Sequence, residues 1–141
     1  MTKMIPAAAL ALTFGFAAPA LADDKLVTVV TSDNAQTQLM AMVLTTQAVE
    51  KGADAHILLC GAGGDLALTD APKTATAPQP PRDASPQGML QMLMGRGVTV
   101  EVCAIYLPGM GADADVLIEG IGVAQPPAMA ETMLGAQVWS F

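Results

Sequence analysis

The two cysteines are the residues of this chain best suited to do chemistry. Cys60 ends a short apolar run, Ala55–Cys60, and Cys103 lies near the end of another, Val98–Ile105. Both runs are predicted strands, and functional groups in open α/β sheets gather at the carboxyl ends of strands. A thiolate at Cys103, near the start of a following helix, could attack a sulfane sulfur and carry it as a persulfide.

The same two cysteines could instead bond to each other. If their strands are neighbours, both sulfurs lie at one edge of the sheet, and a disulfide there stabilises the fold by about 4 kcal/mol through loop closure. A permanent disulfide would end any sulfur-carrier role for Cys103 and would make Cys60 a structural partner and not a resolving one. The spacing leaves both states open: a structural or redox-active disulfide, or two free thiols.

Other candidate groups point to no cofactor and no metal. The glycine turn at Gly61–Gly64 follows the second strand and lacks the third glycine of a dinucleotide-binding motif. His56 lies inside an apolar strand and is interpreted as a histidine with satisfied hydrogen bonds or as an edge residue. Met89, Met92 and Met94 share one helix, and methionine clusters can bind Cu(I). Methionine at helical spacing more often packs into a core, and this is the interpretation that we adopt.

The elements that position the cysteines alternate along the chain. Apolar and β-branched runs predict five strands, and N-cap residues, helical periodicity and glycine stops predict helices between them. The predicted strands are 25–31, 55–60, 98–105, 120–124 and 136–141, and the predicted helices are 35–51, 86–95, 112–119 and 126–134. This order predicts an α/β fold, a three-layer α/β/α sandwich around a mostly parallel five-stranded sheet. Residues 65–86, rich in proline, are expected to form a long exposed loop with a helical turn near Asp65–Leu68.

The amino-terminal segment predicts export. Lys3 is followed by an uncharged apolar stretch that ends in Ala20-Leu21-Ala22, which is typical of a signal peptide. We expect residues 1–22 to be cleaved after Ala22, although an uncleaved membrane anchor is the alternative. Residues 23–141 then form one periplasmic domain, in a compartment where disulfides persist.

The composition excludes several classes of protein. The chain has 141 residues, of which 52% are hydrophobic, and a formal charge of −7. This length suits one domain, and the apolar fraction excludes a disordered chain. The acidic charge argues against a nucleic-acid partner and against binding to a membrane after signal cleavage.

The carboxyl-terminal part resembles the DsrE/DsrF-like family, including its YchN-type members. The features that carry the resemblance are a methionine-rich helix (MLQMLMGRG), a GVTVEVC strand ending at Cys103, a Gly109–Gly111 turn, a Leu117–Gly120 segment and a terminal AQVWSF strand. The first strand and helix match more loosely, so the resemblance spans nearly all of residues 23–141.

The resemblance implies a five-stranded domain that assembles into a homotrimer, a homohexamer or a hetero-hexamer, and for this chain we expect a homotrimer or homohexamer. It also implies a sulfur relay, in which Cys103 occupies the position that resembles the sulfur-carrying cysteine and a donor or acceptor protein is the partner. This chain departs from the family pattern in three ways. Tyr106 stands where some members have a second cysteine, the turn after the strand has no basic residue, and the chain begins with an export signal. Arg96 is the residue that we expect to supply some of the missing positive charge.

Overall fold

The computed structural model describes residues 24–141 as one α/β domain, so the predicted signal peptide lies outside the described residues. Five parallel strands form one sheet in the order β4-β3-β2-β1-β5. They are β1 (Lys25–Val30), β2 (Asp54–Leu59), β3 (Thr99–Val102), β4 (Gly122–Val123) and β5 (Gln137–Ser140). The predicted fold class, an α/β sandwich around a five-stranded sheet, is confirmed.

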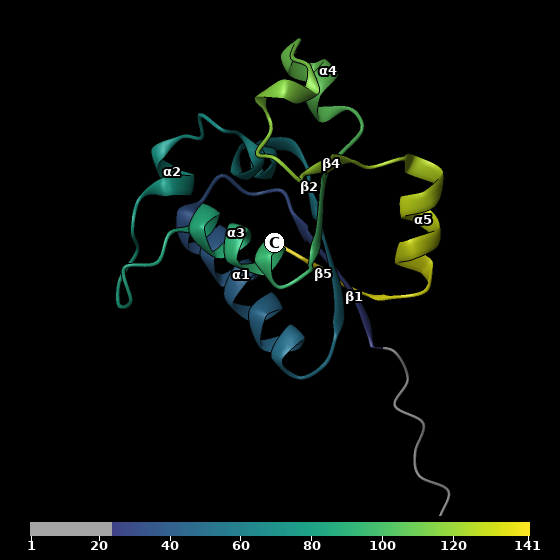
Figure 1. The fold of residues 1–141 in the computed structure, drawn as a ribbon, viewed down its shortest axis with the longest axis horizontal. Helices are drawn as coiled ribbons and strands as arrows, with labels where there is room; N and C mark the ends of the chain where they lie inside the picture. The colour runs from purple at the N-terminus through teal and green to yellow at the C-terminus, as the bar shows by residue number, and fades with distance from the viewer. Residues whose placement is uncertain (1–23) are drawn as a thin grey trace, which may run out of the picture.

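The strand order explains the layers. Each step from β1 to β2 to β3 moves in one direction across the sheet, so right-handed crossovers place α1 (Ala35–Glu50) and α3 (Pro86–Gly95) on the same face. The connection from β4 returns to the opposite edge, and α5 (Pro126–Leu134) covers the other face. Figure 1 shows α1 and α3 on one side of the sheet and α5 on the other.

The core is divided unequally between the two faces. The larger cluster lies under α1 and α3 and joins strand residues such as Ile57, Leu59 and Val102 to Met42 and Leu90 of the helices. A smaller cluster lies under α5 and consists of Val27, Leu58, Ala124 and Met129, with both cysteines packed against it. Since apolar burial is the main force for folding, most of the stability comes from the α1 and α3 side.

Helix α1 directs much of its apolar surface away from the core. Its buried residues are Gln38, Ala41, Met42, Thr45 and Thr46. Thr45 is satisfied by the Thr28 hydroxyl at 2.7 Å and by a helical carbonyl. Met42 is fully buried, but Met40 and Leu44 lie outward, with exposed fractions of 51% and 39%. Among residues 24–141, no helix combines the length and the apolarity needed to cross a membrane.

The prediction of an exposed loop over residues 65–86 is wrong for the first half of that segment. It begins within η1 (Gly61–Ala67) and includes α2 (Lys73–Thr76), and it buries Leu66, Ala67 and Ala75 in the main core. Gln87 anchors this segment by donating to the carbonyl oxygens of Leu66 and Leu68. The prolines mark turns between these short helical pieces, so a proline-rich composition did not mean an unpacked chain.

The chain after β3 also differs from the prediction. The third strand ends at Val102, before the predicted end at residue 105, and α4 (Tyr106–Met110) replaces part of the turn that the sequence suggested at 108–111. The short helix expected over 112–119 is reduced to one 3-10 turn, η2 (Ala114–Val116). Pro108 and Gly109 lie within α4, whose left-handed C-cap is Gly111. The early end of β3 places Cys103 at the start of a turn and not inside a strand.

Candidate functional site

Cys60 and Cys103 form a disulfide at the carboxyl edge of the sheet. Cys60 follows the last residue of β2, and Cys103 follows the last residue of β3. Leu59 and Val102 are register partners in the parallel ladder, so the next residue of each strand faces the other, with a Cα–Cα distance of 5.1 Å. Of the alternatives that the sequence left open, the structure has the disulfide.

The backbone on both sides of the disulfide continues the sheet. The Cys60 amide donates to the Val30 carbonyl at 2.9 Å, and the Cys103 amide donates to the Leu59 carbonyl at 2.9 Å. These bonds hold the two cysteines on adjacent, fixed strand ends. The cysteines themselves are only half-buried, so the disulfide lies at the surface of the smaller core and not inside it.

The glycine turn after Cys60 is explained by close packing. A side chain at Gly63 would collide with the backbone of Val30 at the carboxyl end of β1, and one at Gly64 would collide with the ring of Tyr106. Only glycine lets the chain pass between these groups. The turn therefore brings the loops that follow β1, β2 and β3 into contact next to the disulfide, which accounts for its glycines without a nucleotide.

Tyr106 joins the two loops that carry the cysteines. It stands three residues after Cys103, and its hydroxyl donates to Asp65 Oδ1 of η1 at 2.7 Å. Burial raises the pKa of Tyr106 well above its ordinary value of 10.0, and the hydrogen bond and charge of Asp65 raise it further. The phenol in this position is thus a neutral hydrogen-bond donor that fixes α4 against η1.

Replacement of Tyr106 by Phe should lower the free energy of unfolding by about 1.5 kcal/mol at pH 8, since a hydrogen bond to a carboxylate is lost. The folded state holds the phenol proton more tightly than the unfolded state does. Wild-type stability should therefore decline as the pH rises above the ordinary pKa of 10.0, and the Tyr106→Phe variant should lack that decline. Urea unfolding at pH 8 and pH 11 checks both expectations.

The single tyrosine of the chain gives a direct control for this prediction. Its ionisation can be followed by absorbance without interference from another phenol. Half-ionisation close to pH 10 in the folded protein would contradict the buried hydrogen bond with Asp65.

The chain that follows each cysteine begins with acidic and not basic residues. Asp65 lies in η1 after Cys60, and Asp113, Asp115 and Glu119 lie between Cys103 and β4, a stretch without lysine or arginine. The expectation that Arg96 supports Cys103 is wrong. Arg96 precedes β3 and Cys103 follows it, so the two residues lie at opposite ends of this strand. The Arg96 guanidinium lies 3.2 Å from the Glu50 carboxylate. A thiolate or persulfide at Cys103 thus lacks the cation that the family resemblance led us to expect.

His56 and Glu101 form a polar pair on the α5 face of the sheet, the face on which both cysteines pack. His56 Nε2 lies 2.9 Å from Glu101 Oε2, between β2 and β3. Because β2 pairs with a strand on each side, His56 is not an edge residue, and its ring has the Glu101 carboxylate as its partner. Within the part of the chain that the structure describes, no three His, Cys, Asp or Glu side chains are placed to share a metal ion.

The methionines of α3 do not form one cluster. Met94 packs against the main core, and a Cβ added at Gly120 would lie 3.4 Å from its methyl group, whereas Met92 lines a surface groove. Met89 takes part in both, since it packs on the core and borders the groove. The helix therefore directs these side chains to different surroundings, as packing residues do.

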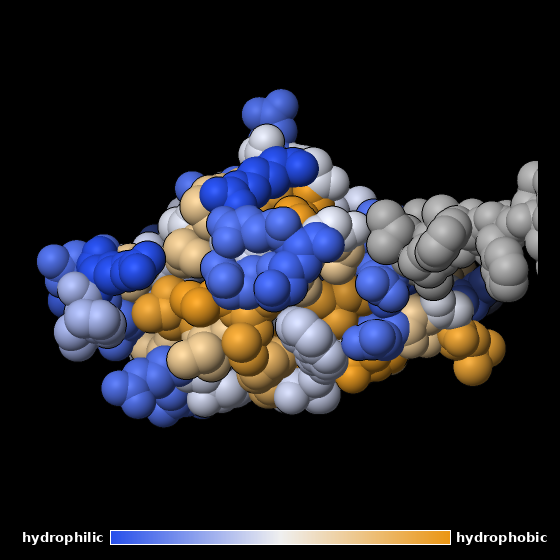
Figure 2. Space-filling model, turned by 90° about the horizontal axis from the view of Figure 1, so that it is seen from below, coloured by the Kyte–Doolittle hydropathy of each residue, from blue (hydrophilic) through white to orange (hydrophobic). Residues whose placement is uncertain are grey.

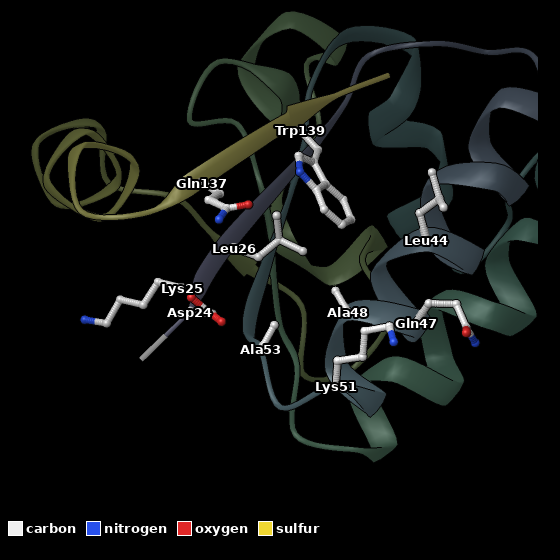
Figure 3. Close-up of a pocket in the computed structure, with 10 residues that line it drawn as sticks. All are labelled: Asp24, Lys25, Leu26, Leu44, Gln47, Ala48, Lys51, Ala53, Gln137 and Trp139. Carbon is white, nitrogen blue, oxygen red and sulfur yellow. The ribbon is translucent and has the colours of Figure 1, made fainter. Parts of the chain in front are cut away.

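Two hollows lie away from the disulfide. One, of about 300 Å³, lies between α1 and the amino ends of the strands and is bordered by Leu26, Leu44 and Trp139 (Figure 3). The other is a groove of about 800 Å³ between α1, α3 and the turn at residues 79–84. Figure 2 views the underside of the domain, where hydrophobic surface lies among hydrophilic residues. Neither hollow is lined by a cysteine.

Solved structures of other proteins have folds similar to this one. YchN from E. coli superimposes with a TM-score of 0.67 at 18% sequence identity, over 85% of this chain and 100% of that chain. The chain has a YchN-type fold. A protein of unknown function from Methanobacterium thermoautotrophicum, MTH1491, shares this YchN-type fold with a TM-score of 0.63 at 16% identity, over 84% of this chain and 100% of that one.

The resemblance to YchN-type members that the sequence suggested is thereby confirmed at the level of the fold. No family model and no curated protein match the sequence. Since the fold alone does not determine activity, the functional argument depends on the site itself. The sequence analysis did not find two features of the site: the hydrogen bond between Tyr106 and Asp65, and the close approach of Gly63 to the backbone of Val30. Both join loops after different strands, so only the strand order reveals them.

Proposed function

We propose that this protein is an exported DsrE-like sulfur carrier that binds sulfur at Cys103, with Cys60 as the resolving cysteine. The observation that carries the proposal is the half-buried disulfide between two fixed strand ends. A buried disulfide would be inert, but a surface disulfide can be attacked by a sulfur nucleophile. Its partners are sulfur donor and acceptor proteins of the periplasm.

The disulfide supplies the oxidising equivalent that loading requires. A hydrosulfide ion attacks the Cys103 sulfur and breaks the disulfide, and the electron pair leaves on Cys60, which takes up a proton as its thiol. Cys103 then carries the incoming sulfur as a persulfide. The sulfide sulfur is oxidised and the disulfide is reduced, so no further reactant is needed for this step.

The loaded sulfur has two exits. An acceptor thiolate that attacks the outer sulfur becomes a persulfide and leaves Cys103 as a thiolate. Alternatively, Cys60 attacks the inner sulfur, expels hydrosulfide and restores the disulfide. After transfer to an acceptor, the dithiol returns to the disulfide by exchange with the disulfide of an exported oxidoreductase, which is itself reduced. Cys60 thus protects the site whenever no acceptor is present.

The proposal predicts a covalent product that mass spectrometry can measure. Incubation of the oxidised protein with sodium hydrosulfide and an alkylating trap should add the mass of one H₂S before alkylation is counted. Peptide mapping should place the extra sulfur on Cys103. The Cys60→Ser variant is the matched control, because its free Cys103 has no disulfide bond to break and should gain no sulfur from hydrosulfide.

Two results would overturn the sulfur-carrier proposal. One is the absence of any adduct while dithiothreitol still reduces the disulfide. The other is extra sulfur found on Cys60 alone. Export has its own test: the protein recovered from the periplasmic fraction should begin at Asp23, and recovery of the intact leader in the cytoplasm would reject it.

A second function is favoured by the outward apolar surface of α1. Leu39, Met40 and Val43 line the groove of about 800 Å³ and do not enter the core. In this alternative, the protein is a non-catalytic homotrimer or homohexamer whose disulfide is purely structural. It predicts that Met40→Glu lowers the assembly mass in light scattering, and that hydrosulfide leaves the disulfide unchanged. A monomeric wild type at micromolar concentration would exclude it.

A further inference from the structure

Strand β5 leaves one edge of the sheet open. It pairs with β1 alone and is the last strand in the sheet order. Phe141 points both of its backbone groups toward β1, because its amide donates to Val29 and its carbonyl accepts from Thr31. Backbone groups of alternate residues point in opposite directions along a strand. The amides and carbonyls of Val138 and Ser140 therefore face away from the sheet.

This edge strand is short, with four residues, but it lacks the other usual features that prevent pairing. Residues 136–141 contain no charged residue and no proline, and the register from Leu26–Gln137 to Val29–Ser140 is continuous, without a bulge. The opposite edge, β4, has only two residues. Open edges are normally short, charged or bent, and β5, which has four residues, no charged side chain and no bulge, is the less protected edge of this sheet.

Apolar side chains flank the open edge on both faces. On the α5 side, Val138 is 42% exposed and Leu134 is 90% exposed. On the α1 side, Trp139 lies over the hollow of about 300 Å³ that Leu26 and Leu44 also line (Figure 3). Unpaired backbone groups between two apolar surfaces form a typical site for the addition of a strand.

We infer that the β5 edge binds the β5 edge of a second copy of this chain in antiparallel orientation. A two-fold axis through Trp139 places Val138 of each copy opposite Ser140 of the other, where the two residues exchange both backbone hydrogen bonds. A second copy supplies the same unpaired groups and the same apolar flanks. The protein is acidic, but residues 136–141 are uncharged, so two copies meet here without opposing like charges on the strand.

The inference is independent of the proposed sulfur chemistry. The disulfide joins the ends of β2 and β3, and β1 separates both from β5. Two copies joined at β5 would form one continuous sheet and would leave both disulfides accessible. Contacts through α1 use a different surface, so the two kinds of interface are compatible in one assembly.

Substitution of Ser140 by Pro tests the interface, because proline removes the outward amide and cannot donate across the edge. The matched control is Ser140→Val, which keeps the amide and favours a strand. The mass of the purified protein in light scattering should halve in Ser140→Pro and stay unchanged in Ser140→Val. A monomeric wild type, or an unchanged mass in Ser140→Pro, would overturn the inference.

The single tryptophan gives a readout that does not depend on the proline variant folding well. Trp139 lies on the proposed axis, so its fluorescence should shift to longer wavelength when dilution separates the copies. Ser140→Val should show the same concentration dependence as the wild type. Emission that stays constant across a dilution that halves the mass would place the interface elsewhere and reject the β5 pairing.

Discussion

Reduction of the Cys60–Cys103 disulfide is expected to lower the free energy of unfolding by about 4 kcal/mol, because the bond closes a segment with a sequence separation of 43. The closed segment includes η1, α2, α3 and β3, so its loss affects a large part of the main core. A domain of this size is stabilised by about 5–15 kcal/mol, and the reduced protein should therefore be marginal at elevated temperature. Urea unfolding with and without dithiothreitol measures the difference.

The double variant Cys60→Ser/Cys103→Ser is the control for this prediction. It should have the stability of the reduced wild type, and dithiothreitol should not change it. A difference below about 1 kcal/mol between oxidised and reduced wild type would show that the unfolded chain gains little from opening the loop. The proposed sulfur-loaded form would lack the bridge as well, so the proposed sulfur transfer from Cys103 would pass through a less stable state of the protein.

Much of the fold could be predicted from local sequence patterns. The β-branched run after Lys25 gave β1, and Ser85 before Pro86 gave the start of α3, where the Ser85 hydroxyl accepts from the Gly88 amide at 3.1 Å. The proline pair at Pro126 marked the first turn of α5. These elements are determined by signals within a few residues, which one sequence is enough to show.

The failures of the prediction concern features that depend on how distant parts of the chain pack together. The first half of residues 65–86 is packed because Leu66 and Ala75 meet α3 and the sheet, a tertiary contact that the proline content obscured. The prediction placed Arg96 beside Cys103 because the two residues are close in sequence, but a strand separates them in space and puts them at its opposite ends. The outward apolar face of α1 could not be separated from its buried face by composition, since Thr45 is buried and Leu44 is 39% exposed.

The candidate site was only half predictable for the same reason. Sequence patterns placed Cys60 and Cys103 at strand ends, but the disulfide required β2 and β3 to be neighbours, which depends on the strand order. The role of Tyr106 required the loops after both strands to touch. Because no family model matches the chain, related sequences could not indicate which distant residues touch.

Replacement of Gly63 by Ala should have the second large effect, a loss of about 3 kcal/mol in the free energy of unfolding. The new Cβ would overlap the carbonyl group of Val30 and crowd the amide of Thr31. These are backbone atoms at the carboxyl end of β1, which is hydrogen-bonded to β2 and to β5, so they cannot move aside as a flexible side chain could. Relief would require η1 to shift, and with it Cys60, whose carbonyl accepts from the Gly63 amide.

The matched control is Gly95→Ala, at the end of α3, where a Cβ would meet nothing within 4 Å. Since glycine is a poor helix former, this change should be neutral or should stabilise the protein by up to about 1 kcal/mol. Urea unfolding of both variants under oxidising conditions isolates the packing effect from the disulfide. Equal stabilities for the two variants would mean that η1 moves freely, and the rigid placement of Cys60 beside Cys103 would then have to come from the strands alone.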